Sequence, residues 1–197
     1  METLELEDDP GRYVSTGDLP SPDDVRAVVS EAYERYGTET RGERSRVYPA
    51  LARVPADLFG ICVAGTTGQV YGAGDAEVPF TIMSVAKPFV FALVCQALGP
   101  EEARRTLGVN ATGFPFNSVV AVERSPDGRT NPMVNAGAIA TTSLVPGAGA
   151  EERWQTLRDG LSRFAGRPLE LDEEVYASAA TTRRSAQSAS SGRPSFH

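Results

Sequence analysis

The chain contains very little lysine, histidine or cysteine. Among its 197 residues the one lysine is Lys87, the one histidine is the last residue, His197, and the two cysteines are Cys62 and Cys95. A structural metal site needs several Cys, His or acidic ligands at suitable spacing, and a Ser-His-Asp or Cys-His site needs a histidine base. The composition therefore argues against a metal centre and against both kinds of catalysis, unless His197 folds back into a site. Two cysteines in apolar segments are typical of reduced thiols packed in a core.

The chain also lacks a basic surface and an export signal. Its formal net charge is −7, whereas a nucleic-acid backbone or an anionic membrane needs a basic partner. The first residues have neither the basic segment nor the apolar segment that export requires, so we expect a cytoplasmic protein without a membrane span. With 41% apolar residues, the length suits one globular domain with a substantial core.

Composition divides the chain into three parts. Residues 1–20 are acidic and then rich in Gly, Pro and Ser, which predicts a flexible leader. Residues 21–178 carry the hydrophobic periodicity and are expected to form the folded domain. Residues 179–197 are rich in Ser, Ala, Thr and Arg and contain no acidic residue, so we expect a disordered tail.

The central part predicts several helices and one hairpin. A helix is expected after the cap residue Ser21, ending at Gly37, and the other helices are expected over residues 88–98, 101–107, 135–144 and 151–164. Residues 58–64 predict a buried strand, followed by a turn and a returning strand that Gly72 and Gly74 end. Residues 109–133 are expected to be mostly loop. Trp154 lies on an apolar helical stripe and is expected in the core.

The lone lysine stands three residues after Ser84, in an apolar stretch. If a helix begins near Ser84, positions i and i+3 lie on one face. Apolar neighbours disfavour the charged ammonium, so Lys87 could act as the neutral base that activates the Ser84 hydroxyl for nucleophilic attack. The alternative is a buried helix start from which the lysine extends to water, because Ser-x-x-Lys is a weak motif by itself.

A second group of polar residues surrounds the predicted helix start at residue 135. It consists of Phe116-Asn117-Ser118, Glu123, Asn131 and Asn135. An asparagine before a Gly- and Ala-rich helix offers a carbonyl and an amide, which suit an amino-acid zwitterion or a side-chain amide. The alternative is a helix cap that satisfies the first backbone N–H groups. The small residues of this helix, Gly137 among them, would allow a close backbone contact.

Together these segments resemble the serine-dependent glutaminases, whose fold is similar to that of β-lactamases and penicillin-binding proteins. The motifs, in the family's order, are Tyr48-Pro49-Ala50-Leu51-Ala52, Gly72-Ala73-Gly74-Asp75-Ala76, Ser84-Val85-Ala86-Lys87, Phe116-Asn117-Ser118 and Asn131-Pro132-Met133-Val134-Asn135-Ala136-Gly137-Ala138-Ile139. The resemblance implies an α+β fold, with an antiparallel sheet and a helical cluster. It implies hydrolysis of L-glutamine to L-glutamate and ammonia without a metal or organic cofactor. By the same resemblance Ser84 is the nucleophile, Lys87 is its base, and Ser84, Asn135 and Tyr48 bind L-glutamine. Members of the family form homo-oligomers.

The chain departs from the family pattern at several places. Met83 stands where the family has Gln before the serine, and Val47 stands where its tyrosine would be. After Ser178 the family places a Glu, an Arg-Asn pair, two later tyrosines and a Gly-rich strand, which this chain replaces with the low-complexity segment. We therefore expect a glutaminase fold that is truncated, incomplete at its C-terminus. Two alternatives stay open: a catalytically inactive fragment, or another Ser-x-x-Lys acyl hydrolase, although the latter typically has a Lys-Thr-Gly strand and an export signal.

Overall fold

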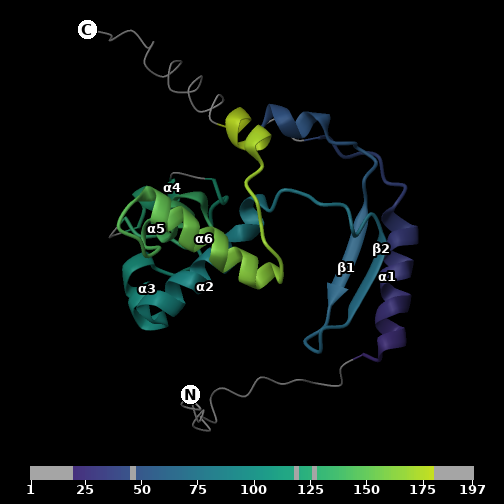
Figure 1. Ribbon diagram of the computed structural model, residues 1–197, viewed down its shortest axis with the longest axis horizontal. Coiled ribbons are helices and arrows are strands. Elements are labelled where there is room, and N and C mark those ends of the chain that lie inside the picture. Colours follow the sequence, from purple (N-terminus) through teal and green to yellow (C-terminus); the bar gives the residue numbers. More distant parts are fainter. Residues whose placement is uncertain (1–19, 45–47, 118–119, 126–127, 180–197) are drawn as a thin grey trace. The chain divides into compact units, whose positions relative to one another are not determined.

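The structure is a computed structural model that describes residues 20–44, 48–117, 120–125 and 128–179 (Figure 1). The described chain forms two compact units, divided between Pro79 and Phe80. All but the last residue of the predicted leader, 1–20, and all but the first of the predicted tail, 179–197, lie outside the described residues. Both stay predictions.

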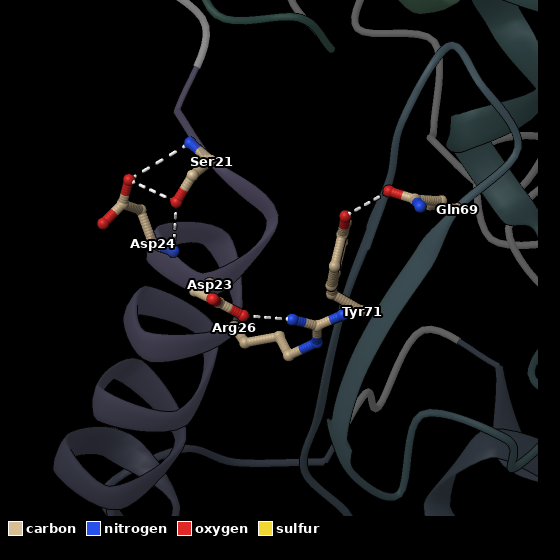
Figure 2. Close-up of polar contacts among 6 residues, drawn as sticks. All are labelled: Ser21, Asp23, Asp24, Arg26, Gln69 and Tyr71. Atoms are coloured by element: carbon tan, nitrogen blue, oxygen red, sulfur yellow. Dashed lines mark hydrogen bonds and ion pairs between the residues drawn. The ribbon is translucent and has the colours of Figure 1, made fainter.

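In the first unit, helix α1 (Pro22–Tyr36) begins with a capping box, which confirms the predicted start. The Asp24 carboxylate accepts from the Ser21 backbone N–H and hydroxyl at 3.1 and 2.7 Å, and the Ser21 hydroxyl oxygen accepts from the Asp24 N–H at 3.2 Å (Figure 2). These hydrogen bonds from Ser21 hold the pKa of Asp24 below its usual value. An ionised carboxylate in the first turn also interacts favourably with the helix dipole. Gly37 ends the helix, as expected.

Strands β1 (Gly60–Ala64) and β2 (Val70–Gly74) pair antiparallel, which confirms the hairpin. Two details of the prediction are wrong. β2 includes Gly72 and Gly74 instead of ending before them. The first strand is not buried either, since Ile61 is half-buried and the other residues of β1 are exposed. An apolar run of this length does not reveal how much of a strand is covered, and here α1 packs against the pair.

Helix α1 is fixed to the hairpin by aromatic contacts. The Tyr33 ring stacks on Phe59, with ring centroids 5.8 Å apart. The Arg26 guanidinium lies 5.4 Å from the centroid of the Tyr71 ring, and Figure 2 shows the two side chains facing each other. Gly74 has a φ of +65°, and a Cβ at this position would lie 2.1 Å from the Tyr33 ring. Only glycine therefore suits both the backbone conformation and the contact with α1. A short 3-10 helix, η2 (Pro49–Arg53), belongs to the same unit.

The second unit is a cluster of helices around α2 (Ala86–Leu98), as Figure 1 shows. The 3-10 turn η3 (Met83–Val85) leads into α2, and the other helices are α3 (Pro100–Leu107), α4 (Val120–Glu123), α5 (Asn135–Ser143) and α6 (Ala150–Ala165). Helices α3, α5 and α6 contact α2. The core between them consists of Val90, Val94, Ala103 and Val145. The predicted helices are confirmed with small boundary shifts, the largest being the start of α2 two residues earlier.

Helix α6 approaches α2 at a buried glycine. A Cβ at Gly160 would lie 2.4 Å from Leu93 Cδ1, and Leu157 and Leu161 on the same side pack against the core. Trp154 is 39% exposed, so its predicted place in the core is wrong. The contact is centred on Gly160, and Trp154 lies beyond it on the apolar stripe, nearly two turns earlier.

No single helix in the described part of the chain is long and apolar enough to cross a membrane. Residues Met83–Leu98 and Pro100–Leu107 pass such a test only as a pair, by length and composition, and are bent by 118° at the break between them.

The two cysteines differ in exposure. Cys95 is half-buried and packs beside the core of the second unit, in agreement with the prediction. Cys62 is exposed on β1, so its predicted place in a core is wrong, because the strand on which it lies is largely uncovered. Burial raises the pKa of the Cys95 thiol.

We expect a thiol-selective reagent to modify Cys62 well before Cys95. The thiolate is the reactive form, and at about pH 8 burial keeps Cys95 protonated and shielded. Peptide mass spectrometry over a time course measures the two rates. The Cys62→Ser variant is the control and should react slowly, through Cys95. Equal rates in the folded parent chain would contradict the packing of Cys95.

Candidate active site

Ser84 and Lys87 lie where the chain enters α2. Ser84 is exposed in η3, and Lys87 is half-buried as the second residue of α2. Across a 3-10 turn that continues as an α-helix, residues three apart point to the same side. Met83, directly before the serine, has a φ of 43°, which is uncommon for a residue other than glycine. Backbone strain of this kind clusters at functional sites and marks this turn as a candidate.

The Lys87 amine binds two oxygens from a distant part of the sequence. Its Nζ donates to the Met133 carbonyl oxygen at 3.0 Å and to Asn135 Oδ1 at 2.7 Å. Within the described residues these are its hydrogen bonds, and neither is made with Ser84. A neutral amine has two N–H donors and one lone pair. With two donors taken by these acceptors, the remaining position on Nζ is a lone pair in the neutral amine and a third N–H in the ammonium.

Asn135 connects the lysine to a further loop. It is the first residue of α5, and its backbone N–H donates to the Phe116 carbonyl oxygen at 2.8 Å. The cap position is Val134, which has no side-chain cap, so the helix-cap interpretation of Asn135 is wrong. Asn131 has a local role instead, because its Oδ1 accepts from the Met133 N–H at 2.8 Å and closes the turn before the helix. The sequence did not indicate that the Asn135 side chain faces the lysine.

Gly137 allows the turn to approach α5 closely. A Cβ at this buried position would lie 2.0 Å from the Asn131 carbonyl oxygen and 2.9 Å from that of Thr130. The close backbone contact predicted for the small residues of this helix is therefore confirmed. The contact places Met133 and Asn135 on either side of a tight bend, where both reach Lys87.

We predict that Gly137→Ala destabilises the chain by about 1–3 kcal/mol, because the new methyl group meets backbone atoms that cannot rotate away. This loss should exceed the helix-propensity gain of about 1 kcal/mol that alanine normally brings. Urea unfolding measures the change. Gly42→Ala is the matched control, since nothing lies within 4 Å of a Cβ there and little change is expected. An increase in stability for Gly137→Ala would contradict the contact.

Tyr48, the remaining residue of the predicted site, lies in the first unit. It is half-buried and extended, and it directly precedes η2. Its role in binding L-glutamine stays a prediction, as do the roles of Ser84, Lys87 and Asn135.

A hollow of about 550 Å³ lies elsewhere in the second unit, at the end of α6. Its lining includes Arg158, Arg163 and Arg167 together with Asp159 and Glu170, and none of the predicted site residues. The candidate active site is therefore identified from its hydrogen bonds and from the strained turn before Ser84 rather than from this hollow.

Sequence comparison finds one family over most of the chain. A family model described as Glutaminase matches residues 42–191. Glutaminase 2 of Yersinia pestis is 65% identical over 170 residues, which are 86% of this chain and 50% of that protein. The Glutaminase of Brucella abortus (strain S19) is 43% identical over 162 residues, 82% of this chain and 51% of that protein. The chain thus spans about half the length of these curated relatives.

Solved structures with a similar fold are also described as glutaminases. A probable glutaminase, ybaS, matches with a TM-score of 0.78 and 35% identity, over 83% of this chain and 53% of that one. A probable glutaminase from Bacillus subtilis complexed with 6-diazo-5-oxo-L-norleucine matches with a TM-score of 0.64 and 26% identity, over 90% and 52% of the two chains. The predicted fold class, a β-lactamase-like α+β fold of which this chain has only part, is confirmed by these neighbours.

Proposed function

Since this chain belongs to the glutaminase family, we propose that it hydrolyses the side-chain amide of L-glutamine to L-glutamate and ammonia. The hydrogen bond from Lys87 to Asn135 carries the proposal. It brings the predicted base within 2.7 Å of the residue predicted to bind glutamine, although 48 positions separate them in the sequence. We propose this activity for the 197-residue chain itself, which spans about half the length of its relatives.

In the proposed reaction the Ser84 oxygen attacks the carboxamide carbon while the Lys87 lone pair takes the hydroxyl proton. The proton then passes to the leaving nitrogen, the carbon–nitrogen bond breaks, and ammonia departs from a glutamyl ester on Ser84. Water hydrolyses this ester, with Lys87 again moving the proton. Backbone N–H groups near Ser84 would stabilise the negative oxygen of each tetrahedral intermediate.

Asn135 supplies the proposed contact with the substrate. Lys87 Nζ donates to Asn135 Oδ1, so the oxygen of the amide faces the lysine. In the described part of the chain the Nδ2 group of Asn135 binds no acceptor, which leaves two N–H donors for a carboxylate or carbonyl of glutamine. We further propose Tyr48 as a glutamine ligand, a cytoplasmic location, and the homo-oligomeric state implied by the resemblance.

A second candidate is a chain that keeps this fold without turnover. The observation that favours it is the half-length match to the relatives, which leaves half of each relative without a counterpart here. An acyl hydrolase with a different substrate would also use Ser84 and Lys87. Assays on the purified chain separate these possibilities.

We predict that the purified chain releases ammonia from L-glutamine, and that Ser84→Ala and Lys87→Ala each lower the rate about a hundred-fold or more. The first variant removes the nucleophile and the second removes its base. An enzyme-coupled ammonia assay measures the rates. Ser143→Ala is the matched control, because this exposed hydroxyl on α5 bonds to the Ala140 carbonyl of its own helix, and it should keep the parent rate.

The ammonia assay has three further possible outcomes, and each leads to a different conclusion. A folded parent chain that releases no ammonia would overturn the proposed activity and favour the chain without turnover. Activity that survives in both Ser84→Ala and Lys87→Ala would show that the reaction does not use this pair. Hydrolysis of another acyl compound, lost in both variants while glutamine stays intact, would identify a different acyl hydrolase.

A further inference from the structure

Phe116 belongs to a motif shared with the family, yet the proposed reaction gives it no role. Its carbonyl oxygen accepts from the Asn135 N–H at 2.8 Å, and the centroid of its ring lies 5.5 Å from Lys87 Nζ. Since Lys87 also donates to Asn135, the three residues form a closed set of contacts. Each member contacts the other two, although they come from three separate segments of the chain.

The Phe116 ring is 61% exposed, so burial in a core does not explain its position. The face of an aromatic ring attracts a cation, and a centroid within about 6 Å is close enough for this interaction. In the described residues Lys87 has no acidic partner, so two carbonyl-type oxygens and this ring are the groups that stabilise a positive charge on its amine. The face of such a ring attracts a cation and has no such attraction for a neutral amine.

We propose that Phe116 is a positioning residue for Lys87, whose ring stabilises the charge that forms on the amine when it takes the proton of Ser84. In that step the Ser84 O–H bond breaks, its electron pair stays on the attacking oxygen, and a new N–H bond makes the amine cationic. An interaction that strengthens as this charge develops lowers the barrier. The Phe116 carbonyl acts on the same site, because it fixes the backbone of Asn135 and with it the oxygen that orients Lys87.

The single lysine allows a test that needs no turnover. An amine-selective acylating reagent modifies the neutral amine and not the ammonium, and in this chain it can label Lys87 and the N-terminal amine, which peptide mass spectrometry separates. We expect Phe116→Leu to raise the labelling rate of Lys87 about two- to five-fold near neutral pH, because the ring no longer stabilises the ammonium. Phe116→Tyr keeps the ring and should restore the parent rate.

Phe114→Leu is the matched control. Phe114 lies two residues earlier in the same loop, and its ring faces a different cation, Arg124, at 5.3 Å. The same substitution there should leave the Lys87 rate unchanged. The pH profile separates charge from access: at about pH 11, where a lysine is largely uncharged, the difference between Phe116→Leu and the parent should disappear. A gain in access alone would persist at that pH.

The proposal is overturned if Phe116→Leu labels at the parent rate, if Phe114→Leu speeds labelling equally, or if the gain persists at high pH. Circular dichroism checks that each variant is folded. If Phe116→Leu unfolds, Phe116→Trp decides, because indole binds a cation more strongly and should label at or below the parent rate; faster labelling would refute the contact.

The catalytic meaning of this contact rests on the proposed function, but the two fail separately. A chain that releases no ammonia and still shows the expected labelling pattern would remove the activity and leave the interaction of Phe116 with Lys87. In an active chain, Phe116→Leu should move the rise of kcat with pH to lower pH, with little change in KM, because the ring no longer stabilises the protonated amine.

Discussion

The hydrogen bonds of the Lys87 amine determine the arrangement of the candidate active site. Met133 and Asn135 lie 46 and 48 positions further along the chain, and their oxygens meet the amine at 3.0 and 2.7 Å. These contacts bring the start of α2 against the start of α5. They also occupy two of the three positions around Nζ and leave one, which is a lone pair in a neutral amine and an N–H in an ammonium. The exposed Ser84 stands three positions before this lysine, in the turn that leads into α2.

The contacts depend on the backbone around them. Gly137 lets the Asn131 carbonyl approach α5 to a distance that any side chain would prevent, and the Asn131 side chain closes the turn that carries Met133. The Phe116 carbonyl holds the Asn135 N–H from the other side. Gly137 thus serves two purposes: it allows the turn to pack against α5, and it allows Met133 and Asn135 to reach Lys87. Around this site Val85, Phe116 and Ile139 are 57%, 61% and 73% exposed, so much of its border is apolar and uncovered.

Local sequence signals predicted the elements well. The Ser21 cap, the hairpin and the helices are where periodicity, caps and glycines placed them, because these signals act over a few residues. Exposure was predicted less well. Cys62 and Trp154 were assigned to a core from their apolar neighbourhoods, yet covering them depends on elements far away in the sequence, and neither is covered. The chain spans about half the length of its relatives, and its apolar pattern does not show how much of each surface this half covers.

The candidate site, too, was predictable only where it rests on residue types, and not where it depends on the fold. The spacing of Ser84 and Lys87 is visible in the sequence, and the resemblance singled out Asn135, whose side chain contacts the lysine. The carbonyl of Met133 could not be predicted, because a backbone oxygen leaves no trace in the sequence. The ring of Phe116 could not either, because the side chain is an ordinary apolar residue until the fold places it beside a cation.

The most direct test of the central claim, that Lys87 activates Ser84, is to trap the acyl intermediate. The folded chain is mixed with an activated γ-glutamyl ester, quenched in acid within seconds and digested, and the peptide that carries the glutamyl group is identified by mass spectrometry. The account predicts a glutamyl ester on Ser84 that forms at least about a hundred-fold more slowly in Lys87→Ala. A Ser84 ester that forms equally fast without Lys87, or a parent chain acylated only at other residues, would contradict it.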